Sequence, residues 1–211
     1  MQRPRRQYPS LRRSLVRVHE DLLTIHNAIE PWLATYPQGL TLFERCVLVL
    51  EDRKFFAHMG INWRRIMVET LKAMVCLRHG GASTIDMQLV RTATNYRKRT
   101  LKRKIYEMML SYIIQHRYSK ILILRSYLNI AYFGTGFSGA SSPSYELFGK
   151  HPDQLNLQEA SKLASFLVFP KPRSENSEWK RKVSRRSNYI ESVYPRYEKR
   201  FNKIENRIFI K

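Results

Sequence analysis

Apolar residues in this chain recur mainly at steps of three and four, and this spacing limits the fold more than any other feature. An α-helix turns once in about 3.6 residues, so residues spaced this way share one helix face. One stripe precedes Pro31 and consists of Leu11, Leu15, Val18, Leu22, Ile25 and Ile29. Another lies between Trp63 and Leu77 and consists of Ile66, Met67, Leu71, Met74 and Val75. The sequence therefore predicts a mainly α-helical protein.

Capping signals separate the helical stretches from one another. A hydroxyl or amide side chain followed three residues later by an acid marks a helix start, because each side chain can bond the other's backbone N–H. This pattern occurs at Thr41 with Glu44, at Ser83 with Asp86 and at Asn156 with Glu159. Ser119 predicts a further start. We expect helices over about 41–51, 63–77, 83–91, 100–118, 119–131 and 156–166.

The predicted helix over 100–118 carries the most informative geometry. Arg99, Arg103 and Glu107 follow one another at steps of four, so they share a helix face. A cation one turn away from Glu107 keeps that carboxylate ionised, whatever its function. A second carboxylate, Glu51, stands at the predicted end of another helix.

Two carboxylates among many cations suit chemistry on a sugar with an anionic leaving group. A sugar hydroxyl is a weak nucleophile at neutral pH, so a transferase needs a base that takes its proton as the new bond forms. The charge that builds on a diphosphate leaving group must be met by Arg, Lys or a metal ion. Composition alone favours a plainer interpretation, in which these glutamates and cations belong to ordinary solvated helix faces.

Four motifs in a fixed order outweigh that plainer interpretation. The first runs from Glu51 to Gly60 and reads Glu-Asp-Arg-x-Phe-x-x-His-x-Gly, and the second runs from Gly81 to Val90 and reads Gly-x-Ser-Thr-Ile-x-x-Gln-Leu-Val. The third is Arg103-Lys104-x-x-Glu107, and the fourth is Tyr118-Ser119-Lys120-x-x-Ile-Leu-x-x-Tyr-Leu-Asn129. Together they resemble the peptidoglycan glycosyltransferases, glycosyltransferase family 51, which polymerise lipid II. The resemblance runs from about Leu40 to Pro172.

The resemblance implies a role for each matching residue. Glu51 would be the general base that activates the acceptor's 4-hydroxyl, giving a β-1,4 linkage with inversion at the donor's anomeric carbon. Glu107 would be the second catalytic carboxylate, which orients the donor or helps hold a divalent cation, Mg²⁺ or Mn²⁺, near the diphosphate. No organic cofactor is expected. The substrate-binding set would be Asp52, Phe55, His58, Ser83, Thr84, Gln88, Arg91, Arg99, Arg103, Lys120 and Asn129.

Within this set the residue types suggest different tasks. The cations would neutralise phosphate oxygens, and Thr84, Gln88 and Asn129 would hydrogen-bond sugar or phosphate groups. Asp52, Phe55 and His58 resemble supports for the base, with a structural hydrogen bond favoured over proton transfer for His58. Phe55 is favoured as a packing residue over a platform for a sugar ring.

Several positions depart from the family pattern. Asp86-Met87 stands where the family usually has Thr-Gln, and a carboxylate there would oppose a bound diphosphate unless it faces away or helps hold a metal. Arg125 replaces a Glu, which would exchange a structural ion pair for a cation. Pro143 would break a helix turn, and the glycine-rich stretch 134–139 predicts a flexible loop. These departures bear on substrate identity more than on reaction type.

The family's fold is lysozyme-like, with a large helical lobe facing a small jaw across a cleft. The apolar helix before Gly80 would belong to that membrane-facing jaw. We expect a basic N-terminal segment with an amphipathic helix over 1–39, a catalytic domain over 40–172 and a basic C-terminal tail over 173–211. The apolar neighbours of Cys46 predict a buried thiol, and with only two cysteines neither a disulfide framework nor a zinc site is indicated.

The net charge of +21 draws polyanions. The expected partners are a lipid-linked disaccharide diphosphate and an anionic membrane surface, while a membrane-anchored protein partner stays open and no nucleic acid is expected. No stretch approaches the roughly 18 apolar residues of a membrane span, and the N-terminus does not read as a signal peptide. We therefore expect peripheral attachment to the bacterial cytoplasmic membrane, on a side left open. The stripe from Leu11 to Ile29 fits packing on the domain or on another helix as well as it fits lying on a bilayer.

Two classes of function follow. The first is an active glycosyltransferase that extends a lipid-diphosphate-linked glycan, peptidoglycan by default. The second is a binding protein with the same fold that no longer turns over, which Asp86 and Arg125 make conceivable. A lysozyme-like hydrolase fits less well, because hydrolysis does not call for so many cations around a cleft.

Overall fold

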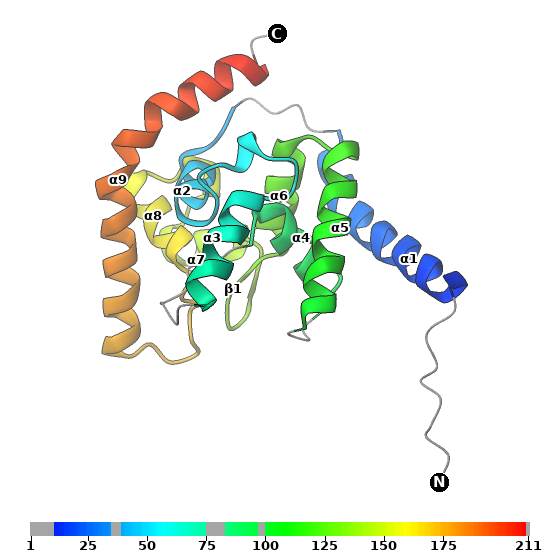
Figure 1. Ribbon diagram of the computed structural model, residues 1–211. Coiled ribbons are helices and arrows are strands. Elements are labelled where there is room, and N and C mark those ends of the chain that lie inside the picture. The colour runs from blue at the N-terminus through cyan, green and yellow to red at the C-terminus, as the bar shows by residue number, and fades with distance from the viewer. Residues whose placement is uncertain (1–10, 35–38, 75–82, 97–99, 210–211) are drawn as a thin grey trace.

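The computed structural model describes residues 11–34, 39–74, 83–96 and 100–209, and the predicted helical class is confirmed (Figure 1). In chain order the first α-helices are α1 (Leu11–Ile29), α2 (Leu42–Glu51), α3 (Trp63–Met74), α4 (Ile85–Ala93) and α5 (Leu101–Arg117). The later ones are α6 (Lys120–Ile130), α7 (Ser141–Phe148), α8 (Leu157–Ser165) and α9 (Ser177–Phe209). Short 3₁₀ turns η1 (Glu30–Trp32), η2 (Phe55–Ala57) and η3 (Pro152–Gln154) connect some of them.

Helix starts are set by the side chains that cap them. Thr41 and Asn156 form the predicted capping boxes, and Thr100 and Ser119 accept hydrogen bonds from backbone N–H groups of the first turns of α5 and α6. The prediction for α4 is wrong by one residue. Thr84, not Ser83, is its N-cap and accepts from the backbone N–H of Met87.

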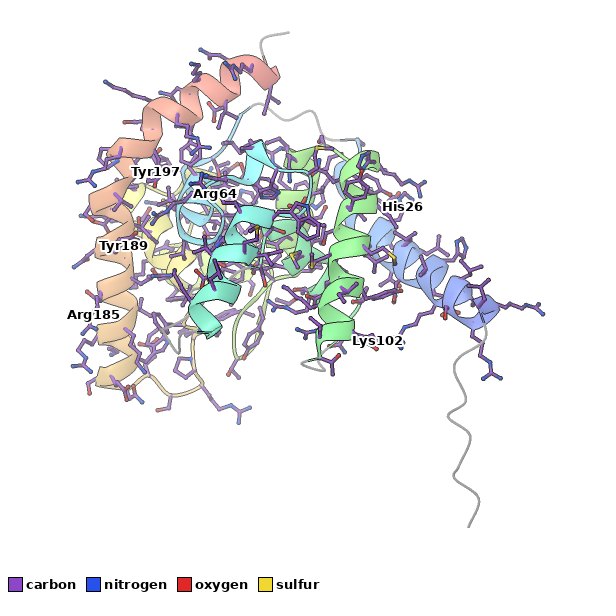
Figure 2. The ribbon with its side chains drawn as sticks, viewed as in Figure 1. His26, Arg64, Lys102, Arg185, Tyr189 and Tyr197 are labelled. Atoms are coloured by element: carbon purple, nitrogen blue, oxygen red, sulfur yellow. The ribbon has the colours of Figure 1, made fainter. Side chains whose placement is uncertain are left out.

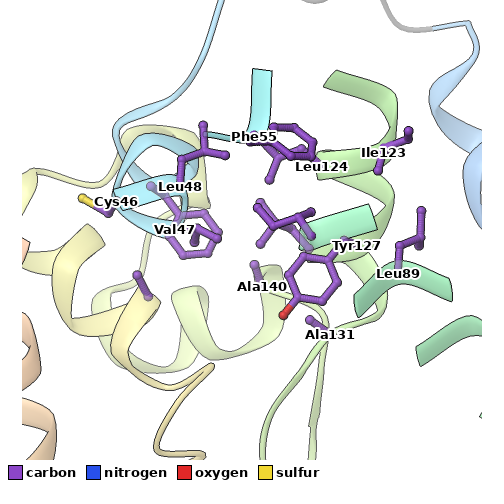
Figure 3. Close-up of a cluster of buried hydrophobic side chains, with 14 of the residues drawn as sticks. Cys46, Val47, Leu48, Phe55, Leu89, Ile123, Leu124, Tyr127, Ala131 and Ala140 are labelled. Atoms are coloured by element: carbon purple, nitrogen blue, oxygen red, sulfur yellow. The ribbon is translucent and has the colours of Figure 1, made fainter. Parts of the chain in front are cut away.

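The core lies where α2, α4, α6 and α8 meet (Figure 3). Val47, Leu89 and Leu124 have no exposed surface, and each fully buried side chain of this size contributes roughly 1.5–3 kcal/mol. Cys46 is also fully buried, which confirms the predicted thiol. In contrast, none of the described side chains of α3 is buried, so α3 lies on the surface.

Two local predictions are wrong. The glycine-rich stretch forms an antiparallel hairpin, β1 (Tyr132–Gly134) and β2 (Phe137–Ser138), because Gly134 at φ 143° lets the chain lie against the backbone of Lys171. Pro143 does not break α7, because it sits in the first turn, where a backbone N–H has no intrahelical acceptor.

The guanidinium of Arg125 forms an ion pair. Its Nε lies 2.8 Å from Glu44 Oε1, and its Nη2 donates to the backbone oxygen of Gly39 at 2.9 Å. The expected loss of an ion pair at this position is therefore wrong, because Glu44 supplies the partner from α2.

The charged segment near the C-terminus forms the long helix α9, which packs on α8 and α2 (Figure 1). Its apolar residues are few, but Val183, Ile190, Tyr194 and Phe201 are all buried. Arg45 of α2 lies 2.7 Å from Glu205 near the far end of α9. The division of the chain after residues 39 and 172 stays a prediction.

Candidate active site

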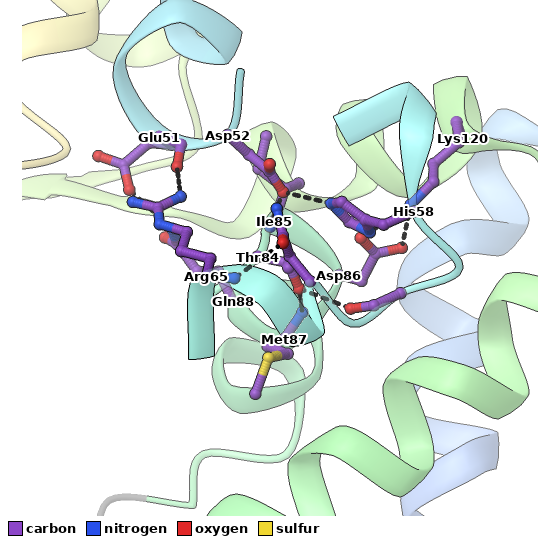
Figure 4. A network of polar contacts seen from close by, with 12 residues as sticks. Glu51, Asp52, His58, Arg65, Thr84, Ile85, Asp86, Met87, Gln88 and Lys120 are labelled. Carbon is purple, nitrogen blue, oxygen red and sulfur yellow. Dashed lines mark hydrogen bonds and ion pairs between the residues drawn. The ribbon is translucent and has the colours of Figure 1, made fainter. Parts of the chain in front are cut away.

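Glu51 is the last residue of α2, so its side chain leaves the helix at its C-terminal end (Figure 4). Glu51 Oε2 accepts a hydrogen bond from Gln88 Nε2 at 2.7 Å. The amide of Gln88 is in turn oriented by Tyr127, whose hydroxyl donates to Gln88 Oε1 at 2.6 Å and is buried. Three helices, α2, α4 and α6, thus fix one carboxylate oxygen.

Glu51 also lines a pocket of about 410 Å³ whose walls are strongly cationic. The other lining residues are Leu50, Asp52, Arg53, Lys54, Asn62, Arg64, Arg65 and Val68. Arg65 on α3 donates from Nη1 to the backbone oxygen of Glu51 at 2.8 Å, and Asn62 accepts from the backbone N–H of Arg65. The helix α3 is therefore attached directly to the backbone of Glu51.

Asp52 follows Glu51 and points the other way, into the protein. Its Oδ2 lies 2.9 Å from His58 Nε2 and 3.4 Å from the backbone N–H nitrogen of Ile85, at the start of α4. Asp52 and Phe55 are each 1% exposed. Both side chains thus lie almost entirely inside the protein, where they support the segment that carries Glu51, and their part in substrate binding stays a prediction.

Asp86 is fully buried, and Lys120 Nζ lies 3.0 Å from both of its carboxylate oxygens (Figure 4). The Lys120 ammonium also lies 4.3 Å from the centre of the Phe55 ring. Burial raises the pKa of Asp86 and lowers that of Lys120, while their mutual attraction opposes both shifts. A phosphate would have to compete with Asp86 for Lys120.

Asp52, His58 and Asp86 also form a potential metal-ligand group, with one ligand atom from each lying within 4.8 Å of the other two. Lys120 already balances the charge of Asp86 within this cluster. Thr84 lies beside it, has no exposed surface, and donates from Oγ1 to the backbone oxygen of Gly60 at 2.7 Å. This hydrogen bond joins the first two motifs, and the predicted contact of Thr84 with a substrate stays a prediction.

Glu107 lies on α5, is 2% exposed, and faces two cations. Its Oε1 lies 3.3 Å from Arg103 Nε and its Oε2 lies 3.5 Å from Lys104 Nζ. Lys104 Nζ also donates to Ser83 Oγ at 2.9 Å, and burial lowers the pKa of this ammonium against the opposing pull of Glu107. The predicted face of this helix is confirmed for Arg103 and Glu107.

Three predicted residues remain. Arg91 is exposed at the last turn of α4, and its charge helps lower the pKa of the Lys104 ammonium, while Arg99 lies outside the described residues. Asn129 lines a different pocket, of about 430 Å³, beside Glu44 and Arg125. Glu107 does not line the pocket of Glu51, as far as the described part of the chain defines that pocket.

Sequence reasoning missed Tyr127 and Arg65. Tyr127 belongs to the fourth motif, but nothing in the motif says that its hydroxyl reaches a residue 39 positions away. Arg65 lies within the predicted helix over 63–77, and no motif or spacing marks it as a functional residue.

The sequence model of the family described as Transglycosylase matches residues 26–194. The chain belongs to this transglycosylase family. The match includes all four motifs and extends into α9 as far as Tyr194, which is buried.

Individual relatives in this transglycosylase family match a shorter region. Penicillin-binding protein 2a of Streptococcus pneumoniae is 37% identical over 127 residues, which is 60% of this chain and 17% of that protein. A putative transglycosylase of Cupriavidus necator is 37% identical over 131 residues, 62% of this chain and 55% of that protein. A biosynthetic peptidoglycan transglycosylase of Bordetella avium is 34% identical over 133 residues, which is 61% of this chain and 55% of that protein. The aligned region thus spans about half the length of these last two relatives.

Proposed function

We propose that this chain is an inverting glycosyltransferase that polymerises a lipid-diphosphate-linked glycan, peptidoglycan from lipid II by default, with Glu51 as the general base. The observation that carries the proposal is the Glu51–Gln88–Tyr127 chain of hydrogen bonds at the edge of a cationic pocket. The name of the Bordetella relative supports peptidoglycan as the product.

The proposed reaction uses Glu51 to take one proton. As the acceptor's 4-hydroxyl oxygen bonds to the donor's anomeric carbon, its proton passes to Glu51, and the bond from that carbon to the diphosphate oxygen breaks. Attack from the face opposite the leaving group inverts the anomeric centre. Gln88 holds one oxygen of Glu51, which leaves the second oxygen of the carboxylate to accept the proton.

The leaving diphosphate needs positive charge near it. In this proposal Arg91, Arg99, Arg103 and Lys104 supply that charge, and Glu107 orients the last two through its ion pairs. A Mg²⁺ or Mn²⁺ ion stays part of the proposal, since Mg²⁺ commonly binds through one carboxylate together with substrate phosphates. Because Arg103 and Lys104 already balance Glu107, no step depends on that ion.

The proposed substrate is membrane-bound, and α3 offers a surface for the bilayer. Trp63, Met67 and Leu71 stand one turn apart on α3 and are between 58% and 64% exposed. Among the described residues, the helices are too short or too polar to traverse a bilayer. We propose peripheral attachment to the bacterial cytoplasmic membrane. The side of the membrane and the involvement of a membrane-anchored protein partner are left open.

The second candidate is a protein that binds the lipid diphosphate without turnover. The departures at Asp86 and Arg125 make it conceivable. Asp86 is paired with Lys120 and Arg125 with Glu44, so neither departure leaves a lone charge, which supports turnover over binding alone. Activity is therefore the better supported of the two.

Purified chain, labelled lipid II and a divalent cation test the proposal, with glycan length on a gel as the readout. We expect Glu51→Gln to abolish polymer while lipid II still binds. Glu178→Gln, on the exposed side of α9, is the matched control and should polymerise like the wild type. If wild type and Glu51→Gln both bind lipid II and neither forms polymer, the binding protein is the correct reading.

A further inference from the structure

The first two turns of α1 extend beyond the body of the domain (Figure 1). Ile25 and Ile29, at the C-terminal end of the apolar stripe, are fully buried, and Val18 and Leu22 pack partly against the core. Leu11 and Leu15 continue the same stripe but are 78% and 61% exposed. The stripe therefore passes from the core onto an apolar surface without a partner among the described residues.

Specific contacts hold α1 in this position. Tyr106 of α5 donates from its hydroxyl to Asp21 Oδ2 at 2.7 Å. The Arg17 guanidinium lies 4.5 Å from the centre of the Tyr96 ring and 3.9 Å from Asp21. One nitrogen of His26 lies 2.7 Å from the Tyr118 hydroxyl, where α1 meets the end of α5 (Figure 2). The exposed turns thus project from a fixed helix.

The charge of these turns narrows what can cover Leu11 and Leu15. Arg12, Arg13 and Arg17 lie on the rest of the helix surface, and the first turn of α1 contains no acidic residue. A second copy of a chain with a net charge of +21 would bring like charges together. An anionic lipid surface offers both an apolar layer for the leucines and phosphates for the arginines.

We propose that the first two turns of α1 lie in the interface of an anionic bilayer, with Leu11 and Leu15 inserted and Arg12, at the edge of the same face, reaching lipid phosphates. This contact deepens the membrane attachment in the proposed function, but it is separate from that of α3. It can therefore fail while the glycosyltransferase proposal holds.

Co-sedimentation with vesicles of phosphatidylglycerol and phosphatidylcholine, compared with phosphatidylcholine alone, tests this surface. We expect Leu15→Asp to weaken binding to the anionic vesicles at least tenfold. Val16→Asp is the matched control, because Val16 is 50% exposed on the polar side of the same helix and should change binding less than threefold. Raising the salt concentration should weaken the wild type.

The same pair is measured again in a Met67→Asp background, so that binding through α3 cannot hide a loss at α1. Polymer formation in detergent should be equal for Leu15→Asp and Val16→Asp, which separates this inference from the catalytic proposal. Equal vesicle binding by both variants in both backgrounds would overturn it. So would a wild-type dimer that Leu15→Asp dissociates while vesicle binding is unaffected.

Discussion

Lys120 at the start of α6 and Asp86 in the first turn of α4 form a buried ion pair, with the ammonium nitrogen 3.0 Å from both carboxylate oxygens. The Asp86 side chain has no exposed surface and that of Lys120 is 12% exposed. This pair joins α6 to the helix that carries Gln88, and Gln88 holds Glu51.

We predict that Asp86→Thr lowers the free energy of unfolding by about 3–5 kcal/mol, because it leaves a buried ammonium without its partner. Replacing both residues, Asp86→Thr with Lys120→Met, should cost less than the sum of the single changes by about 1–3 kcal/mol. Chemical denaturation of the wild type, the two single variants and the double variant measures these free energies. If the losses of the two single variants add up to that of the double variant, the two charges do not stabilise each other.

Tyr127→Phe should reduce turnover about tenfold, because the amide of Gln88 loses the hydroxyl that orients it toward Glu51. The unfolding free energy should fall by about 1–3 kcal/mol, since Gln88 Oε1 loses its buried donor. Tyr132→Phe is the control, at a side chain that is 57% exposed. Polymerisation kinetics with lipid II measure the effect, and wild-type turnover of Tyr127→Phe would separate Tyr127 from the site.

Local signals in the sequence were enough for most helices. Thr41 and Asn156 bond backbone groups within three residues, so their boxes can be identified without any knowledge of the fold. Ser83 and Thr84 show the limit of this reasoning. Both carry a hydroxyl near the start of α4, so local sequence does not say which one is the N-cap. The residue that caps the helix, Thr84, also donates a hydrogen bond to the backbone oxygen of Gly60, which is distant in the sequence.

Motif order could propose residues for the site but not the contacts between them. It proposed Glu51, Gln88 and Glu107, whereas the pairing of Lys120 with Asp86 depends on two helices that meet across 34 residues of chain. The buried face of α9 was missed for a similar reason, because its sparse apolar residues become a packing face only beside α8.

Cys46 should resist thiol reagents in the native chain, since burial raises its pKa to about 12 and keeps the thiol protonated. In the unfolded chain the pKa is about 8.5. A group whose pKa is raised on folding stabilises the native state fully below the unfolded value, and this stability is lost as the pH rises toward 12. Relative to Cys46→Ala, stability should therefore decline above about pH 8.5. Reaction with a chromogenic disulfide at pH 8, in a Cys76→Ser background, should require denaturant, and rapid labelling of the native chain would contradict this.

Gly60 sets how closely the segment carrying Glu51 approaches α5. Its φ is 75°, and a Cβ atom there would lie 2.5 Å from the backbone oxygen of Ser111, one turn after Glu107. Gly60→Ala should therefore add a clash to the backbone cost of roughly 1–2 kcal/mol for a positive φ. We expect a large loss of unfolding free energy together with reduced turnover, because the two carboxylate segments are forced apart.

Gly136→Ala isolates the backbone cost, since Gly136 has φ 86° in the β1–β2 hairpin and no atom within 4 Å of the added Cβ. Thermal unfolding of both variants should place Gly60→Ala well below Gly136→Ala, and the difference measures the contact with Ser111. Equal unfolding temperatures would mean that the 51–60 segment can move away from α5 at little cost. In that case Gly60 would not fix the spacing between the segments that carry Glu51 and Glu107.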